Sequence, residues 1–252
     1  CISALRKQAC KWSGNLFRCI YVTVLMRMNM SVLSAHKQTP LMKIFHFIST
    51  PSSINYGVWS VVIKPFDTLK EQFGADIVLC FPKSEEELHE EIRQQPWKAI
   101  APEDDALGKA LRGYRPHDTI IVTHGNWSLP TKWGIALKQA GYRWIAAPHG
   151  MLEPWSIRHR WLKKQLYYRL LEKPRLNKAD AIVAVGRPEY ENLSRQFSNV
   201  VHIPNGIDPY EGDVGKPEAP VRFLFLGRLH KKKGVVPLVQ AWTESELMGD
   251  ER

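Results

Sequence analysis

Short apolar runs alternate with longer amphipathic stretches along most of this chain. The apolar runs have the length of buried strands, and the stretches between them have the length of helices. Strands are predicted from the runs at residues 43–48, 76–81, 119–123, 143–147, 181–185, 200–203 and 221–226. Helices are predicted between them at residues 57–72, 84–95, 103–112, 130–140, 155–172 and 188–196. This alternation predicts an α/β fold in which a parallel sheet carries helices on both faces.

A stretch rich in proline and glycine, PNGIDPYEGDVGKPEAP, interrupts the alternation. Such a composition is typical of a linker, and a new predicted strand follows it at Val221. We therefore predict a first Rossmann-like domain at residues 42–204, a linker at 205–220 and the start of a second domain at 221–252. Because one strand and one helix cannot bury a core, we expect the second domain to be cut short at Arg252.

The first 41 residues show no comparable period. The first clear strand pattern, MKIFHFIS, begins at Met42. The apolar run CIYVTVLM at residues 19–26 is too short to span a bilayer. Arg18 before it is compatible with a signal peptide, but no convincing small-residue cleavage site follows. We interpret residues 1–41 as a non-native or disordered leader and expect the natural protein to begin at Met42.

The composition fits a folded domain with an excess of positive charge. Of the 252 residues 44% are hydrophobic, and 35 lysines and arginines stand against 25 acidic residues, for a net charge of +10. This excess favours partners that carry phosphate: nucleic acid, an anionic membrane or phosphorylated small molecules. No nucleic-acid recognition motif is present, so we do not expect nucleic acid as a partner.

The cysteines indicate a reducing compartment. Cys80 alone lies in the body of the protein, and there is no C-x-x-C pair and no spacing of Cys and His typical of a zinc site. We therefore expect a cytoplasmic protein without disulfides and without a bound metal.

Parallel sheets bind their ligands at the carboxyl ends of the strands. The predicted loops at these ends read STPSSINYGVWS, HGNW, PHGMLEPW, PNGID and GRLHKKKG. Ordinary turns have a similar composition, so any one of the loops is weak evidence. Because five such loops share one edge of the predicted sheet, we expect the functional site at this edge.

The loop GRLHKKKG combines glycines with cations that suit phosphate. Gly227 lets the backbone turn after the predicted strand, and Gly234 is predicted to begin a helix whose first amide groups favour an anion. Arg228 can hold two phosphate oxygens with its planar guanidinium, and Lys233 supplies a mobile positive charge. The alternative is a solvated basic turn.

Two other loops contain candidate binding residues. His149 follows a predicted strand, where an imidazole can donate a hydrogen bond to a substrate hydroxyl. The alternative is a histidine whose hydrogen bonds are satisfied within a turn. Gly57 begins the first predicted helix, where a diphosphate can rest on the helix amides, although an ordinary helix start has the same pattern.

The segment 155–178 mixes aromatic and aliphatic residues with many lysines and arginines. This mixture suits an anionic membrane surface. The alternative is a helix with one face packed on the sheet and the other face in solvent.

Four motifs occur in a fixed order: PHGMLEPWS before a basic helix, then ADAIVAVGRPEYENL, VVHIPNGID and FLFLGRLHKKKG. In this order they resemble the family 4 glycosyltransferases, and in particular those that build bacterial exopolysaccharide and lipopolysaccharide. The resemblance covers residues 42–242. It implies the GT-B fold, with two Rossmann-like domains of which the first mainly binds the acceptor and the second binds the donor.

The resemblance also implies an activity. It is retaining transfer of a sugar from a nucleotide-sugar donor to a saccharide or lipid-linked acceptor, without a bound metal, because protein cations stabilise the departing diphosphate. The implied location is cytoplasmic, with the inner face of the plasma membrane as a peripheral site.

The resemblance assigns roles to several residues. Arg228 and Lys233 match the pair that grips the donor diphosphate, and His149 matches a histidine near the reacting sugar. The implied catalytic residues are therefore His149, Arg228 and Lys233. The implied donor-binding residues are Gly57, Gly227, Arg228, Lys233 and Asn205. The implied acceptor-binding residues are His124, Glu153 and Trp155.

The chain departs from the family pattern in two places. Many members have two adjacent glycines in the first loop, whereas here Tyr56 precedes Gly57. The family's E-x7-E motif is absent before Arg252, so we expect this chain by itself to be inactive.

Two rival functions remain to be compared with glycosyl transfer. One is a non-catalytic, basic protein that binds a membrane surface through residues 155–178. The other is a different Rossmann-type enzyme such as a sugar-nucleotide epimerase. The missing G-x-G-x-x-G and Tyr-x-x-x-Lys motifs argue against the epimerase.

Overall fold

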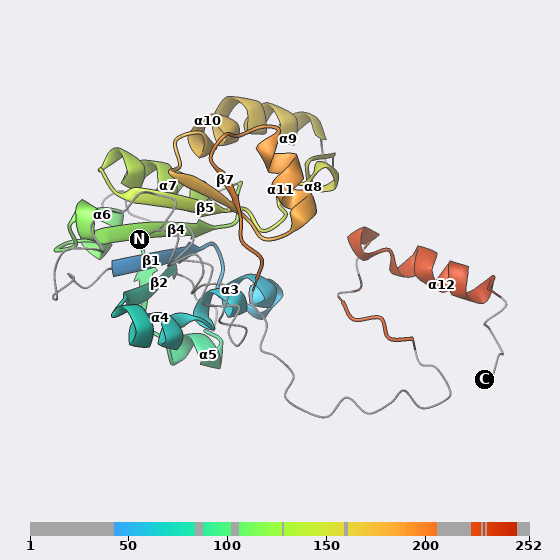
Figure 1. The fold of residues 1–252 in the computed structure, drawn as a ribbon, viewed down its shortest axis with the longest axis horizontal. Coiled ribbons are helices and arrows are strands. Elements are labelled where there is room, and N and C mark those ends of the chain that lie inside the picture. Colours follow the sequence, from blue (N-terminus) through green and yellow to red (C-terminus); the bar gives the residue numbers. More distant parts are fainter. Residues whose placement is uncertain are drawn as a thin grey trace, which may run out of the picture. The chain divides into compact units, whose positions relative to one another are not determined.

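The computed structural model describes residues 43–83, 88–101, 106–127, 129–158, 161–205, 223–227, 229 and 231–245 (Figure 1). The chain divides into two compact units, residues 1–208 and 209–252. The predicted leader at residues 1–41, most of the predicted linker and Arg228 lie outside the described residues.

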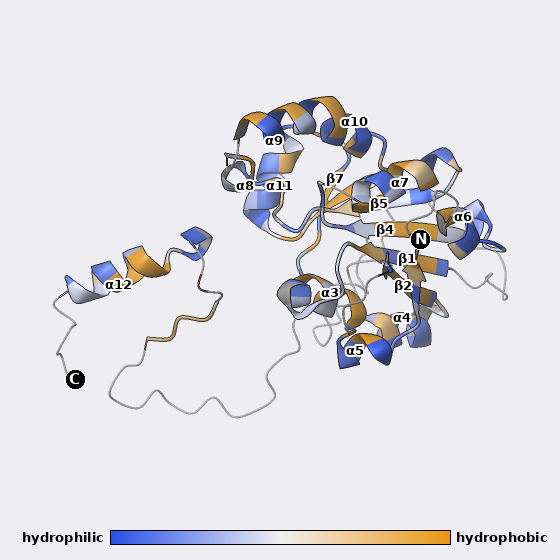
Figure 2. Ribbon diagram, turned by 180° about the vertical axis from the view of Figure 1, so that it is seen from behind, coloured by the Kyte–Doolittle hydropathy of each residue, from blue (hydrophilic) through white to orange (hydrophobic). Residues whose placement is uncertain are grey.

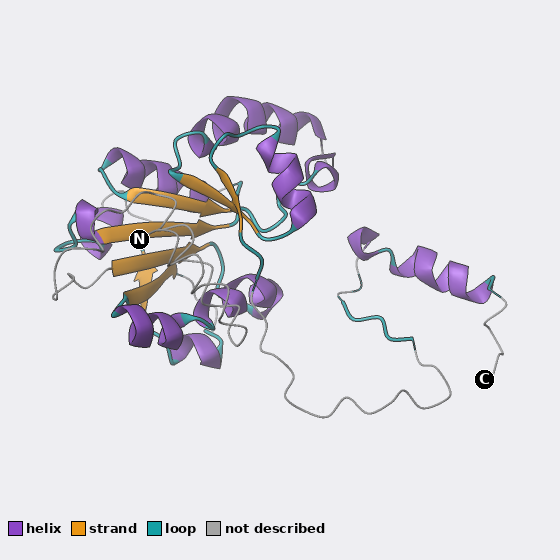
Figure 3. Ribbon diagram, viewed as in Figure 1, coloured by secondary structure: helices purple, strands orange, loops and turns teal. Residues whose placement is uncertain are grey.

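The first unit contains one sheet of seven parallel strands (Figure 3). The strands are β1 Lys43–Ile48, β2 Asp76–Pro82, β3 Trp97–Ile100, β4 Thr119–His124, β5 Arg143–Ala147, β6 Ala181–Ala184 and β7 Val200–His202. Their order in the sheet is β3-β2-β1-β4-β5-β6-β7, and every pair is parallel. The predicted Rossmann-like α/β fold is therefore confirmed.

The strand order reverses beside β1. The chain passes from β1 outward to β2 and β3, and then returns to place β4 on the other side of β1. Ile48, the last residue of β1, is in register with His124, the last residue of β4. Two chain segments that diverge from neighbouring strand ends leave a crevice, which is where ligands of open α/β sheets bind.

Alternating side chains of the strands form a core on each face of the sheet. In β1, Ile44 and Ile48 pack on one face, and Phe45 and Phe47 pack on the other. The first face is covered by α3 Tyr56–Ile63, α4 Phe66–Phe73 and α5 Glu90–Arg93. The second is covered by α6 Ala106–Ala110, α7 Leu129–Gln139 and α11 Arg187–Ser194. Figure 2 shows apolar residues along the strands between these helix layers.

Local chemistry explains where several elements begin and end. The predicted helix at 57–72 is two helices, because Pro65 cannot continue the hydrogen bonding of α3 and instead precedes α4. Gly74 ends α4 in the left-handed conformation (φ 59°), and its amide donates to the carbonyl of Lys70. The strand β3 was not predicted. β3 lies at the edge of the sheet, where only Ile100 of its four residues is buried and Trp97 is exposed. Its sequence WKAI therefore lacks the continuous apolar run of a buried strand.

In the basic segment predicted as one helix, a π-helical turn replaces the α-helix from Tyr168 to Glu172. The segment forms α8 Pro154–Arg158, α9 Trp161–Tyr167, the π-helical turn η5 Tyr168–Glu172 and α10 Lys173–Leu176. Tyr168, Glu172 and Leu176 are buried. Leu162, Leu166 and Leu170 are exposed.

The second unit is described at residues 223–227, 229 and 231–245. The strand predicted at 221–226 is not formed by residues 223–226, and Leu224 and Leu226 are exposed there. A strand needs a neighbour for its backbone hydrogen bonds, and none of the described residues supplies one to this segment. The predicted helix is present: Gly234 precedes α12 Val235–Thr243, after the short turn η6 Lys231–Lys233.

Candidate functional site

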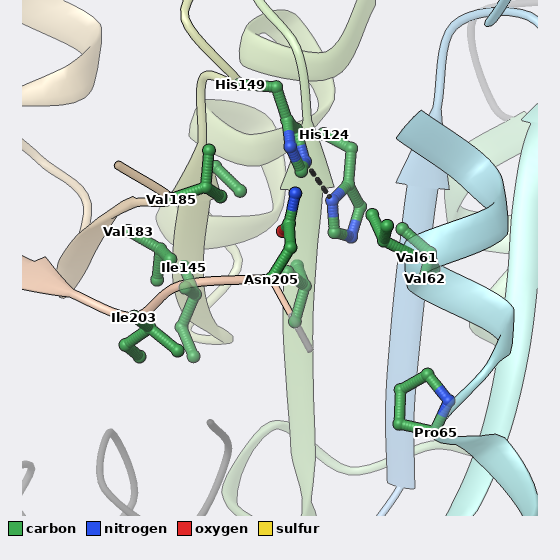
Figure 4. A pocket seen from close by; sticks show the side chains of 12 residues that line it. Val61, Val62, Pro65, His124, Ile145, His149, Val183, Val185, Ile203 and Asn205 are labelled. Atoms are coloured by element: carbon green, nitrogen blue, oxygen red, sulfur yellow. Dashed lines mark hydrogen bonds between the residues drawn. The ribbon is translucent and has the colours of Figure 1, made fainter. Parts of the chain in front are cut away.

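A pocket opens at the carboxyl edge of the sheet in the first unit. The empty volume of the pocket is about 590 Å³, a value that includes space open to solvent at its mouth. Its apolar lining includes Val61, Val62, Val122, Ile145, Val183 and Ile203. Its polar lining consists of His124 at the end of β4, His149 after β5 and Asn205 after β7 (Figure 4). The pocket therefore lies where the strand order predicts a ligand site.

Three histidines from three different segments form a chain of hydrogen bonds at this pocket. Nδ1 of His46, in the middle of β1, lies 2.9 Å from Nε2 of His124. Nδ1 of His124 lies 2.9 Å from Nε2 of His149. The centroids of neighbouring rings are 5.2 Å apart in both pairs, the separation of two imidazoles that meet edge to edge through a hydrogen bond. The parallel pairing of β1 with β4 and of β4 with β5 brings these rings together.

Burial keeps the three imidazoles neutral near pH 7. It lowers the pKa of His46 to about 3 and the pKa of His149 to about 4. Burial also lowers the pKa of His124 well below its usual value, and the neighbouring rings of His149 and His46 lower it further. A positive charge on any of these rings loses hydration that the pocket does not replace. The rings can therefore give or accept hydrogen bonds, but they do not act as imidazolium ions at neutral pH.

The turn that carries His149 is held by a buried carboxylate. His149 (φ 52°) and Gly150 (φ 72°) both have the left-handed conformation, which is unusual for a residue with a side chain. Glu189, in the first turn of α11, accepts hydrogen bonds from the amides of Gly150 (2.6 Å) and Val185 (2.9 Å). One side chain thus fixes the loops after β5 and β6 at the pocket.

A second buried carboxylate holds the loop after β4. Glu172, in the π-helical turn η5, accepts hydrogen bonds from the amide of Trp127 (2.9 Å) and the hydroxyl of Thr131 (3.0 Å). Trp127 has a positive φ of 74°. Beside it, Asn126 is buried, and its amide group has no hydrogen-bond partner among the described residues. This loop is therefore held in a strained conformation next to the end of β4.

The residues predicted for the site fall into three groups. His124, His149 and Asn205 line one pocket. Glu153 and Trp155 lie at the start of α8 and are not part of its lining, and Gly57 is the second residue of α3. Gly227 and Lys233 belong to the second unit, and Arg228 lies outside the described residues. A side chain added at Gly57 would meet no atom within 4 Å, so packing in the described part of the fold does not require a glycine there.

The sequence analysis missed His46 and Glu189. His46 is the one polar residue inside the apolar run IFHFI, and this interruption was the available signal. Glu189 gave no distinct signal, since an acidic residue in the first turn of a helix is common. Among the described residues, no group of three or more His, Cys, Asp or Glu side chains is arranged to hold a metal ion.

The family of the chain follows from comparison with known proteins. Residues 69–211, more than half of the chain, match the family model described as Glycosyltransferase Family 4. The chain belongs to glycosyltransferase family 4. The matched residues of this family 4 glycosyltransferase include β4 to β7, His124, His149 and Asn205.

Comparisons with solved structures and with curated proteins do not narrow the function further. Two crystal structures of homoserine dehydrogenase from S. aureus, at pH 7.0 and pH 6.0, are each 15% identical to this glycosyltransferase, with a TM-score of 0.30. Each match covers 43% of this chain and 26% or 27% of the other, about a quarter of the dehydrogenase. A likeness this weak carries no argument about function. The comparison with curated proteins gives no match.

Proposed function

We propose that this glycosyltransferase transfers a sugar from a nucleotide-sugar donor to a saccharide or lipid-linked acceptor during synthesis of bacterial cell-surface polysaccharide. The transfer is proposed to retain the anomeric configuration. The family membership supports glycosyl transfer, and the ordered motifs support the narrower group. The observation that carries the proposal is His149, a neutral imidazole held in a strained turn beside the pocket at the reversal of strand order.

In the proposed reaction the bond between the sugar and the diphosphate breaks, and its electron pair leaves with the diphosphate. The acceptor oxygen bonds to the same carbon on the face from which the diphosphate departs, so the configuration is retained, and its proton passes to an oxygen of the departing diphosphate. Negative charge grows on the diphosphate as the bond breaks, and Arg228 and Lys233 are the proposed cations that stabilise it, with Gly57 and Gly227 beside them. No metal is needed in this scheme.

In the first unit, His149 is proposed to hydrogen-bond a hydroxyl of the reacting sugar, which positions the sugar. His124 and Asn205 complete the polar lining of the same pocket. Glu153 and Trp155 are proposed to contact the acceptor from the start of α8.

Replacing His149 tests the proposal. In the active enzyme, with a donor sugar found from a panel of nucleoside diphosphate sugars, His149→Ala should lower kcat by about 10²-fold, the usual effect of losing one positioned hydrogen-bonding group. Transfer of radiolabelled sugar to endogenous acceptors in membranes measures it. His202→Ala, at an exposed histidine of β7, is the control and should keep its rate. A folded His149→Ala enzyme with the control's rate would refute the assignment.

A second candidate function is binding to an anionic membrane surface. The specific observation is the exposed row of Leu162, Leu166 and Leu170, spaced four residues apart on a segment rich in lysine and arginine. The one acidic residue between 154 and 178, Glu172, is fully buried, so the exposed charges of this segment are positive where they are described. No described helix is both long and apolar enough to cross a bilayer. Apolar side chains among cations are typical of a segment that lies on a membrane.

A further inference from the structure

The chain of rings from β1 to the pocket restricts how protons are arranged within it. Both ring nitrogens of His124 are used, one toward His46 and the other toward His149. A neutral imidazole has one N–H donor and one bare nitrogen acceptor. His124 therefore donates to one neighbour and accepts from the other.

Only two arrangements satisfy both contacts. In the first, Nδ1 of His46 donates to His124, Nδ1 of His124 donates to His149, and His149 keeps its proton on Nδ1. In the second, Nε2 of His149 donates to His124, Nε2 of His124 donates to His46, and Nδ1 of His149 is bare. All three rings have the same tautomer in each arrangement, Nδ1–H in the first and Nε2–H in the second. If one ring had the opposite tautomer, one of the two 2.9 Å N···N contacts would have either no proton between its nitrogens or a proton on both of them.

The outer nitrogen of His149 is the end of this chain. Nδ1 of His149 has no hydrogen-bond partner among the described residues, while the residue lines the pocket. In the first arrangement this nitrogen donates a hydrogen bond to a bound group, and in the second it accepts one. The polarity that His149 presents is therefore tied to the tautomer of a ring two strands away in the sheet.

We propose that His46 and His124 are positioning residues that set the tautomer of His149. They decide whether its Nδ1 offers a donor or an acceptor to a ligand hydroxyl. The part of this inference that concerns a sugar hydroxyl rests on the proposed function, whereas the coupling of the three tautomers does not. His46 is fully buried within a central strand, so packing holds its ring where Nδ1 meets Nε2 of His124.

The location of His46 argues against a purely apolar role. Its neighbours Phe45 and Phe47 belong to the core on the opposite face, and Ile44 and Ile48 flank it on its own face. An aliphatic residue at this position would continue the strand's apolar run and would leave Nε2 of His124 buried without its partner. A buried polar group without a hydrogen bond destabilises a fold, so the two rings are best explained as a pair.

Nitrogen NMR of the unliganded chain tests the coupling directly. In the uniformly ¹⁵N-labelled chain at pH 7, long-range ¹H–¹⁵N spectra should show three neutral rings with one common tautomer. Scalar coupling between nitrogens across the two N–H···N contacts should also be detectable. Opposite tautomers in neighbouring rings, or a doubly protonated His149, would overturn the proposal.

A substitution then tests the direction of control. In His46→Asn, an amide replaces Nδ1 and can either donate or accept, so it no longer selects one arrangement. The ¹⁵N shift of Nδ1 of His149 should move toward the midpoint between a protonated and a bare nitrogen. His202→Asn is the control and should leave this shift unchanged. If His46→Asn folds and His149 keeps its single tautomer, the proposal is wrong; if the variant does not fold, the couplings in the unsubstituted chain decide.

These results can be separated from a failure of the proposed function. The NMR experiment contains no nucleotide sugar and measures no transfer. Coupled tautomers together with an active His149→Ala enzyme would refute the catalytic proposal alone. Uncoupled tautomers together with an inactive His149→Ala enzyme would refute the positioning proposal alone.

Discussion

His46 lies in the middle of β1 with no exposure to solvent, and burial lowers its pKa to about 3. In the unfolded chain the same group titrates near 6.5. Between these two values the unfolded state binds more protons than the folded state, so the free energy of unfolding falls as the pH falls. Between pH 7 and pH 5 the loss from His46 is about 2 kcal/mol.

Urea unfolding at pH 7 and pH 5 measures this loss. His46→Asn should lose less stability on acidification than the unsubstituted chain, because it has no group at this position that gains a proton on unfolding. Burial raises the pKa of Glu172, so this group stabilises the folded state as the pH falls. Because Glu172 is present in both proteins, its effect cancels when their losses of stability are compared. An equal loss of unfolding free energy in the two proteins would contradict the lowered pKa of His46.

The candidate site could be predicted only in part at the level of residues. His124 and His149 stand at strand ends in loops of turn-like composition, and the structure brings them into contact at 2.9 Å. His46 was missed because an apolar run was interpreted as strand core throughout. Its role depends on the register between β1 and β4, which pairs His46 with Val122 and Ile48 with His124, and a period of two along one strand cannot give this register.

At the scale of elements, helix α11 acts on the pocket through one side chain. Glu189 is almost fully buried and accepts hydrogen bonds from two backbone amides in two different loops. Glu189→Gln keeps the shape but replaces one acceptor oxygen with an NH₂ group, so one amide loses its partner. We expect the free energy of unfolding to fall by about 1–3 kcal/mol.

The same helix offers a matched control. Glu191 has a side chain that is 55% exposed and pairs with Arg187 on the surface. Glu191→Gln should change the free energy of unfolding by no more than about 0.5 kcal/mol. Urea denaturation of both variants measures the difference. Equal stabilities would show that Glu189 does not hold the two loops.

Strands buried on both faces were predicted well because their apolar runs are nearly continuous. β3 was missed because it lies at the edge, and its Trp97 is exposed. The helix predicted at 57–72 overlooked Pro65, which separates α3 from α4. The apolar run at 221–226 predicts a strand, but strand pairing needs a partner, and a local pattern says nothing about whether one is present.

At the scale of the whole molecule, a net charge of +10 favours association with anionic surfaces. If residues 161–176 lie on a membrane, the chain should co-sediment with vesicles that contain anionic lipid and less with neutral vesicles. Replacing Leu162, Leu166 and Leu170 together by Gln should weaken this binding at least tenfold, because their apolar surface no longer enters the lipid.

A second triple variant controls for general loss of apolar surface. Leu224, Leu226 and Leu229 are all highly exposed in the second unit, and their replacement by Gln should leave vesicle binding unchanged. Binding that ignores lipid charge, or that survives the first triple substitution, counts against a membrane surface. Binding that does not respond to nucleotide sugars while transfer is absent favours the non-catalytic function.

The reversal of strand order beside β1 also has a consequence for biosynthesis. His46 and His124 are 78 residues apart in sequence, whereas His124 and His149 are 25 apart. During translation β1 is made first, but the pocket cannot begin to form until β4 has been made and has paired with β1. Closing such a distant contact is slow compared with forming local ones. The ribosome therefore completes β2 and β3 before the ring of His46 can contact the ring of His124. The pocket forms late in folding, after the strands of the sheet have paired.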